Sequence, residues 1–305
     1  MAREKLTGIY IPTVTPFNKD ESINFAGIKE VTKFLAENGV TGIIPSGSTG
    51  EMIALNHDEQ IAVNKAYIEA AHANGIKCVA STGAYRTTDV VKMSQAAQSD
   101  GADGVMVVTP WYMAPSEDQI YNHYKTIHSA IKIPLMLYHN PYYSTCLMSD
   151  KFMAKMYNEG CIDAVKERQA DVYRQQDLRR LTDKDFNIFY GFDVCPVETM
   201  SCWSDGWVCG TGNLFPKENS TVYNLAKARK TVEAMEAHEK LLWPYLHLFM
   251  EPDSNGEILW LQIIKEGLKL RGVDAGYCRK PVTSGLPAET VKRLKDTLKL
   301  YGHIG

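Results

Sequence analysis

Short apolar runs alternate with longer amphipathic stretches along most of the chain. Eight runs are rich in apolar and β-branched residues and have the length of buried strands: residues 8–17, 42–47, 77–83, 104–110, 134–141, 161–167, 186–192 and 206–213. Stretches between the first of them carry apolar residues at helical spacing and end at glycine: residues 25–39, 58–75 and 87–101. This alternation of strand and helix predicts βαβ units and a parallel sheet.

Eight βα units within roughly 220 residues are typical of a closed (β/α)8 TIM barrel, an α/β fold. An open doubly wound sheet is the alternative, but no GxGxxG follows the first strand, so its dinucleotide-binding form has no support. Beyond residue 220 the pattern is helical and no Gly/Ser linker interrupts it. We therefore expect a barrel over residues 1–220 and a C-terminal helical extension over residues 221–305 that packs on the barrel.

Composition and charge narrow the class of protein further. The 305 residues are 45% hydrophobic and 23% charged, as in ordinary globular proteins, and the net charge of −3 gives no indication of a nucleic acid or a membrane surface as partner. No apolar segment near the start has the length of a signal peptide or membrane span. Seven cysteines without a CxxC pair favour reduced thiols. We expect a cytoplasmic protein.

A lysine, Lys166, closes the sixth apolar run, where the simplest interpretation is a strand-end lysine with its head in water. In a TIM barrel, however, active sites lie at the C-terminal ends of the strands. Tyr138 lies toward that end of the fifth run, so the two residues occupy neighbouring strands about 5 Å apart. After the second run, residues 46–52 (SGSTGEM) combine a glycine turn with two hydroxyls, and the N–H groups of such a turn can bind an anion. These groups would face one another at one rim.

Six segments carry a family resemblance: GSTGE (47–51), TPWYMAP (109–115), YHNP (138–141), VKE (165–167), YGFD (190–193) and GWVCGTGN (206–213). With these segments in this order and spacing, the chain resembles the dihydrodipicolinate synthase / N-acetylneuraminate lyase family of Schiff-base-forming barrels. Each segment alone is a weak signal, but the six together cover essentially the whole chain. The resemblance implies a lyase.

The resemblance also implies catalytic roles. Lys166 would condense with the ketone of a 2-oxo acid, and its apolar neighbours would lower the lysine pKa from about 10.4. The protonated imine is then the electron sink, so we expect no metal and no other cofactor. Tyr138 corresponds to the family's proton-transferring tyrosine, and Ser48 to the hydroxyl that relays its proton. Tyr112 corresponds to a tyrosine that the family inserts from a neighbouring subunit, which implies a homo-oligomer, either a dimer or a tetramer.

Further positions correspond to substrate contacts. Thr49 matches the residue that binds the carboxylate of the 2-oxo acid, assisted by the N–H groups of the turn that begins at Gly47. Val208 falls where the family uses a backbone group on the eighth strand. Asn140 shares the strand face of the phenol and is a candidate substrate contact, whereas His139 points to the other face and is expected to be structural.

One departure from the family bears on the substrate. The family's synthases carry an arginine soon after the YNxP-type motif, where it holds the carboxylate of the second substrate. Here residues 138–146 contain no cation, and Tyr143 takes that place. A phenol cannot supply the bidentate grip of a guanidinium, so we expect a substrate with a neutral far end against Tyr143 and negligible turnover of pyruvate with aspartate semialdehyde. The family's synthases also have an allosteric site that binds lysine. We expect this site to be absent here, because Tyr85 and Trp111 stand where the family places polar or phenolic ligands.

Two reactions of the same imine remain open. The first is cleavage of a 2-oxo-3-deoxy acid to pyruvate and an aldehyde. The second is loss of water or ammonia from a hydroxylated 2-oxo acid or a hydroxy-pyrroline carboxylate. Further alternatives are a true dihydrodipicolinate synthase, a phosphate-binding barrel isomerase that uses residues 206–213, and an inactive regulatory barrel. The isomerase leaves Lys166 and Tyr138 unexplained together, and an inactive barrel would be expected to have lost one of them.

Overall fold

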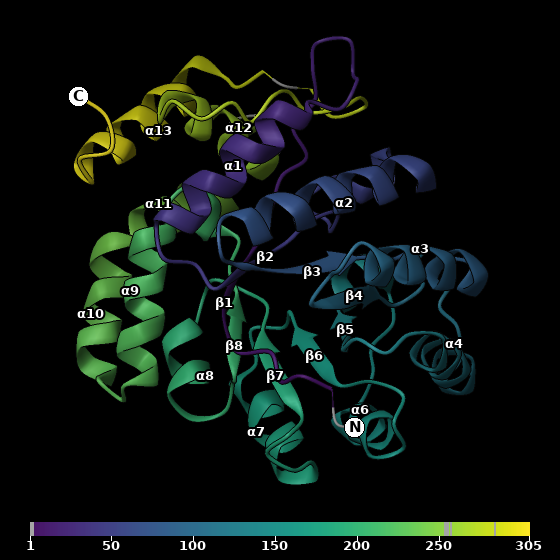
Figure 1. The fold of residues 1–305 in the computed structure, drawn as a ribbon. Coiled ribbons are helices and arrows are strands. Elements are labelled where there is room, and N and C mark those ends of the chain that lie inside the picture. The colour runs from purple at the N-terminus through teal and green to yellow at the C-terminus, as the bar shows by residue number, and fades with distance from the viewer. Residues whose placement is uncertain (1–2, 253–255, 257, 284) are drawn as a thin grey trace.

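The computed structural model describes residues 3–252, 256, 258–283 and 285–305. Its centre is a closed barrel of parallel strands that pair in sequence order, with β8 returning to β1 (Figure 1). The strands are β1 (Gly8–Pro12), β2 (Gly42–Ile44), β3 (Lys77–Ser81), β4 (Gly104–Val108), β5 (Leu135–His139), β6 (Ala164–Glu167), β7 (Asn187–Tyr190) and β8 (Gly206–Val208). The TIM barrel is confirmed, and the open doubly wound sheet is excluded.

Each predicted run contains one strand, but most runs continue past the end of their strand. The first run continues to Phe17 although β1 ends at Pro12, and the last continues to Asn213 although β8 ends at Val208. The extra residues belong to the βα loops at the C-terminal rim of the barrel. These loop residues have the apolar pattern of a buried strand because the rim itself is buried. Phe17, for example, has no solvent exposure.

Helices surround the barrel, and local sequence defines where they start. The helix after β2 begins with a capping box of Asn56 and Glu59, and the helix after β4 with one of Ser116 and Gln119. The surrounding helices are α1 (Phe25–Glu37), α2 (His57–Ala73), α3 (Thr87–Ser99), α4 (Glu117–Ala130), α6 (Asp150–Asn158), α7 (Val172–Leu181), α8 (Pro196–Cys202) and α9 (Pro216–Lys227). Short helices η1 (Met52–Ala54), α5 (Pro141–Ser144) and η2 (Thr211–Asn213) lie in the loops after β2, β5 and β8.

The C-terminal extension is helical and packs on the barrel, as expected. It consists of α10 (Thr231–Leu241), α11 (Trp243–Met250), α12 (Trp260–Leu270) and α13 (Ala288–Leu300). Figure 1 shows α10 beside α9, and α11, α12 and α13 grouped at one end of the molecule. The predicted boundary at 220/221 is wrong, because it falls inside α9, the helix of the eighth βα unit, where no glycine or proline breaks the helical pattern.

Two layers of side chains fill the fold. One layer fills the barrel interior with residues from successive strands, among them Tyr10, Met136 and Phe189. The other lies between the strands and the surrounding helices. Because side chains alternate along a strand, the register that pairs Tyr138 with Lys166 places both in the interior.

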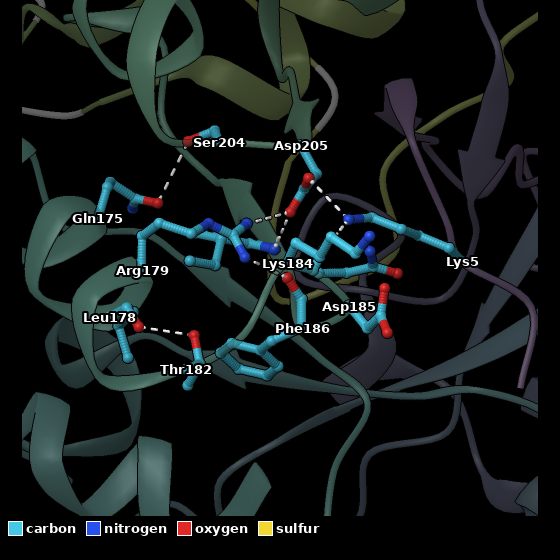
Figure 2. Close-up of polar contacts among 12 residues, drawn as sticks. Lys5, Gln175, Leu178, Arg179, Thr182, Lys184, Asp185, Phe186, Ser204 and Asp205 are labelled. Carbon is cyan, nitrogen blue, oxygen red and sulfur yellow. Dashed lines mark hydrogen bonds and ion pairs between the residues drawn. The ribbon is translucent and has the colours of Figure 1, made fainter. Parts of the chain in front are cut away.

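Charged side chains tie together the N-terminal end of the barrel (Figure 2). Asp205, which precedes β8, accepts a hydrogen bond from Arg179 of α7 and pairs with Lys5 at 3.1 Å. Its carboxylate also accepts a hydrogen bond from the backbone N–H of Ile188 at 2.9 Å. The cluster joins the N-terminal segment to β7 and β8 at the barrel end that supports stability rather than catalysis.

Two further expectations concern the whole chain. No helix of the described residues is long and apolar enough to cross a membrane. No disulfide bond joins the cysteine side chains that the structure describes, which are those of Cys78, Cys146, Cys161, Cys195, Cys209 and Cys278. The side chain of Cys202 lies outside the described part of the structure.

Candidate active site

A pocket of about 350 Å³ opens at the C-terminal ends of the barrel strands. Its walls come from the ends of β1, β5, β6, β7 and β8, from the loop after β2 and from residues of the C-terminal helices. The predicted site residues that line it are Lys166, Tyr138, Ser48, Thr49, Val208 and Tyr143. The structure therefore brings together residues from four different βα units at the rim where TIM-barrel enzymes act.

Lys166 is buried on β6, with 5% of its surface exposed. Its Nζ lies over the Tyr138 ring, 3.9 Å from the ring centroid. Burial lowers the pKa of Lys166 to about 7; the Asp193 carboxylate opposes this shift and the Arg168 guanidinium reinforces it. The interpretation of a strand-end lysine with its head in water is therefore wrong, because the side chain is buried. An amine with a pKa of about 7 is partly neutral at neutral pH, and the neutral form is the one that can act as a nucleophile.

Gly191, just after β7, provides the space that the lysine occupies. A Cβ at this position would lie 2.8 Å from Cγ and 2.9 Å from Cε of Lys166, which is closer than atoms pack. Any larger residue would push the lysine chain out of its place beside Tyr138. The need for space beside Lys166 thus explains why the YGFD segment has a glycine at residue 191.

The Tyr138 phenol is held by a residue just past the end of its own strand. Asn140 Nδ2 donates a hydrogen bond to the phenol oxygen at 2.8 Å. Burial raises the pKa of Tyr138, while the Asn140 hydrogen bond, the Arg168 charge and the Ser48 hydroxyl each act to lower it. The phenol is therefore a proton donor in its resting state, with a second hydroxyl beside it to pass a proton on.

The turn after β2 is held rigidly beneath Ser48 and Thr49. A Cβ on Gly50 would lie 2.7 Å from the backbone nitrogen of Ser46, so the tight turn requires glycine there. The Glu51 carboxylate below the turn is buried and pairs with Lys265 of α12. A turn with N–H groups and hydroxyls fixed in this way can bind a carboxylate without reorganising.

Three predicted site residues do not line the pocket of their own chain. Gly47 lies within the turn, where its carbonyl accepts a hydrogen bond from the Met52 backbone N–H at 3.2 Å. Asn140 has no solvent exposure and contacts the phenol, and its amide oxygen has no hydrogen-bond partner among the described residues. Tyr112 is 89% exposed with a left-handed backbone φ of 73°, and it is not among the residues that line this pocket.

His139 faces away from the pocket, which confirms the expectation of a structural role. Its Nδ1 lies 2.6 Å from Oε2 of Glu167, and neither side chain has any solvent exposure. The Met148 backbone N–H donates to Nε2 at 3.1 Å, so the ring proton sits on Nδ1 and points to the carboxylate. Arg174 also donates to Glu167, at 3.1 Å. This network locks β5 to β6 directly behind Tyr138 and Lys166.

Asp193 lines the pocket, although sequence reasoning gave it no role beyond its place in the YGFD segment. It accepts hydrogen bonds from the Gly210 backbone N–H at 3.1 Å and from the Thr211 hydroxyl at 3.3 Å. Burial raises the pKa of Asp193 to about 6. A carboxylate with this pKa can accept a hydrogen bond or a proton from a substrate hydroxyl near neutral pH.

Arg168 also lines the pocket and was missed. The expectation of a neutral far end of the substrate rested on residues 138–146 alone, and a cation two positions beyond Lys166 removes that support. The available signal was strand alternation, because residue 168 shares the face of residue 166 if the strand pairing continues past Glu167, where β6 ends. Tyr143, which was expected to face that end of the substrate, does line the pocket and remains half exposed.

The chain is similar to known proteins over nearly its whole length. The family model described as Dihydrodipicolinate synthetase family matches residues 5–300. A 4-hydroxy-tetrahydrodipicolinate synthase of Desulforamulus reducens is 30% identical over 290 residues, covering 94% of this chain and 95% of the relative.

Solved structures are similar over the barrel and the C-terminal helices together. A putative dihydrodipicolinate synthetase from Pseudomonas aeruginosa has a TM-score of 0.89 at 28% identity and covers 97% of this chain and 99% of its own. A chloride-inhibited dihydrodipicolinate synthase from Acinetobacter baumannii, complexed with pyruvate, has a TM-score of 0.87 at 28% identity and covers 98% and 99%.

Proposed function

The chain belongs to the dihydrodipicolinate synthetase family and is a lyase of that family, and from this premise we propose that it cleaves a 2-oxo-3-deoxy acid through an imine on Lys166. One observation carries the proposal. A buried amine with a pKa of about 7 lies against a phenol in a pocket that also holds the hydroxyls of Ser48 and Thr49. This is the combination that imine formation requires.

The first half of the reaction makes the imine. The carboxylate of the 2-oxo acid binds at the turn of Ser48 and Thr49, and neutral Nζ of Lys166 attacks the C2 ketone. The Tyr138 phenol donates a proton to the departing hydroxyl through the Ser48 relay and is left as a phenolate, the base that the second half of the reaction needs. Water leaves, and the cationic imine at C2 becomes the electron sink, so we propose that the reaction needs no separate cofactor.

The second half breaks the carbon–carbon bond. The C4 hydroxyl loses its proton to the Tyr138–Ser48 pair, the C3–C4 bond breaks, and its electron pair moves toward the imine to form an enamine. The C4 fragment leaves as an aldehyde. The enamine takes up a proton at C3, and the water that was lost earlier returns to release pyruvate and restore the Lys166 amine. Asp193 can accept a hydrogen bond from a substrate hydroxyl during these steps.

Two other reactions could follow from the same imine. Loss of water or ammonia from a hydroxylated 2-oxo acid or a hydroxy-pyrroline carboxylate needs no additional group. A 4-hydroxy-tetrahydrodipicolinate synthase reaction, the one for which relatives such as that of D. reducens are named, would condense pyruvate with aspartate semialdehyde. Arg168 favours keeping this second candidate, because it supplies a pocket cation that residues 138–146 lack.

The proposal includes a neighbouring subunit. Tyr112 is exposed beside the exposed Met113, at the rim that holds the pocket. We propose that the active protein is a homo-oligomer, either a dimer or a tetramer, in which Tyr112 of one subunit enters the pocket of the next.

The test is release of pyruvate from a panel of 2-oxo-3-deoxy acids, with dehydrated or deaminated products measured in parallel. We expect pyruvate as the product, no activity for Lys166→Arg, and a fall in kcat of about 10²–10⁴-fold for Tyr138→Phe, the usual contribution of a positioned acid–base group. Tyr157→Phe removes a phenol outside the pocket and is the matched control. A dehydrated or deaminated product without pyruvate would contradict cleavage, and unchanged activity of Tyr138→Phe would contradict the proton relay.

A further inference from the structure

The backbone places Arg168 above Lys166 on the pocket face of β6. The Arg168 backbone N–H donates to the His139 carbonyl at 3.1 Å, so the β5–β6 ladder continues one residue past the end of the strand. Side chains alternate along such a ladder, and both residues 166 and 168 line the pocket. The Cα atom of Arg168 is therefore about 6–7 Å nearer the mouth of the pocket than the Cα atom of Lys166.

Two aromatic rings hold the guanidinium, but no carboxylate of the described residues pairs with it. Its Cζ lies 4.2 Å from the centroid of Phe192 and 5.3 Å from that of Tyr142. By contrast, Arg174, six residues later, pairs with both Glu167 and Asp150. Aromatic contacts on the faces of a guanidinium leave its N–H edges available for hydrogen bonding. Arg168 is thus preorganised without having its charge neutralised by an ion pair.

The pocket has two separate positions for anions. The turn of Ser48 and Thr49 follows β2, and Arg168 follows β6, and these strands are four apart in a closed barrel of eight, hence on opposite sides. A 2-oxo acid with its first carboxylate at the turn would be bonded through C2 to Lys166 of β6, the strand that Arg168 follows. The rest of its chain continues toward the mouth, where Arg168 lies.

We propose that Arg168 binds a second carboxylate at the far end of the substrate, so that the substrate of this site is a 2-oxo dicarboxylate. The inference rests on the proposed imine at Lys166 and names the substrate class of that same site. A planar guanidinium edge matches a carboxylate with two parallel hydrogen bonds. This replaces the expectation of a neutral far end, and Tyr143 then borders the carboxylate instead of replacing its cation.

The test compares two 2-oxo acids of equal length that differ only at the far end. 2-Oxoglutarate ends in a carboxylate and 2-oxopentanoate ends in a methyl group. Each is incubated with the full-length protein and borohydride, and the half-saturating concentration for the reduced adduct is measured by intact-protein mass spectrometry. Because both acids use the same amine, their ratio cancels any effect of a substitution on the pKa of Lys166.

We expect the wild-type protein to favour 2-oxoglutarate by about 10- to 100-fold, which is about the contribution of one hydrogen bond to a charged group. Arg168→Gln should bring the ratio close to 1, and Arg168→Lys should retain part of the preference. Arg180→Gln is the matched control, because Arg180 is an exposed arginine on α7 that is 3.8 Å from Asp177 and does not line the pocket. Its ratio should equal that of the wild type.

Each other outcome overturns a defined part of the account. Adducts with both acids but no preference in the wild type, or a preference that survives in Arg168→Gln, would overturn the role of Arg168 and leave the imine intact. Failure to trap any 2-oxo acid, pyruvate included, would overturn the proposed function and this inference with it.

Discussion

At the scale of single residues, burial and two opposite charges set the reactivity of Lys166. Removal from water is the largest influence and lowers the pKa of the amine to about 7, while Asp193 raises it and Arg168 lowers it further. Gly191 leaves the space in which the chain of the lysine lies. The nucleophile therefore depends on residues from β6 and from the loop after β7, and each makes a separate contribution that substitution can measure.

This balance predicts how the rate depends on pH. Imine formation needs the neutral amine, so its rate with pyruvate should rise with pH through about 7. Asp193→Asn removes the carboxylate that raises the pKa of Lys166, so the midpoint of the rise should move to lower pH. Initial rates of borohydride trapping across the pH range measure this midpoint. A midpoint that stays in place or moves upward would show that Asp193 does not act on the amine.

At the scale of elements, the contact between β5 and β6 positions Tyr138 and Lys166, the pair proposed to be catalytic. The two strands are in register at Tyr138 and Lys166, and one residue further along His139 and Glu167 meet on the opposite face. The buried carboxylate accepts hydrogen bonds from Arg174 and from the Gln169 backbone N–H as well. Tyr138 and Lys166 thus face the barrel interior, while the next residue of each strand, His139 and Glu167, connects the two strands on the opposite face.

Glu167→Ala should remove the buried interactions of the Glu167 carboxylate with His139 and Arg174. The substitution leaves His139 and Arg174 facing an empty site, and breaking a buried ion pair costs about 3–5 kcal/mol in the free energy of unfolding. Urea denaturation of the variant beside Glu69→Ala, which removes an exposed glutamate of α2, measures the difference. The control should stay within about 0.5 kcal/mol of the wild type. Equal free energies of unfolding for the two variants would mean that the Glu167 network does not stabilise the fold.

Hydrophobic periodicity was enough to predict the elements, but less so their ends. Alternation of runs and helices predicts all eight strands, because a parallel barrel buries both strand faces. The runs overextend where the rim loops are buried too, as after β1 and β8. Likewise the boundary at 220/221 divides α9, since the eighth barrel helix has the same period as the helices that follow.

The candidate site was predictable where a motif carries it and not elsewhere. Lys166, Tyr138 and the turn with Ser48 and Thr49 lie in segments that resemble the family, and all line one pocket. Arg168 follows the VKE segment without belonging to it, and alternation with Lys166 indicates its face only if the strand pairing continues past Glu167, which the fold shows. Asn140 shares the expected face, but its contact is the phenol, which depends on side-chain packing that sequence spacing does not specify.

At the scale of the whole molecule, the C-terminal helices complete the site. Phe249, Met250 and Trp260 line the pocket from α11 and α12. Lys265 of α12 donates to the Thr15 carbonyl at 2.8 Å and pairs with Glu51 beneath the anion-binding turn. The extension thus forms one wall of the candidate site and supports it from below, and the barrel alone lacks part of this pocket.

The proposed exchange of Tyr112 between subunits predicts complementation. Tyr112→Ala and Lys166→Arg should each be inactive alone. When the two variants are unfolded and refolded together, about half of the dimers should be mixed. One of the two pockets in a mixed dimer has an intact lysine and an intact tyrosine from its partner, so activity should return to about a quarter of the wild-type value. Sedimentation checks that mixed oligomers form. Mixed oligomers without any recovered activity, or a fully active monomer, would contradict a shared site.

The most direct measurement of the central claim is the site of the covalent adduct. The protein is incubated with pyruvate and borohydride, digested, and analysed by peptide mass spectrometry. The account predicts one stable reduced adduct, on Lys166, and none in Lys166→Arg, because a guanidinium cannot act as the nucleophile. An adduct on another lysine, or no adduct with pyruvate or any other 2-oxo acid, would contradict it.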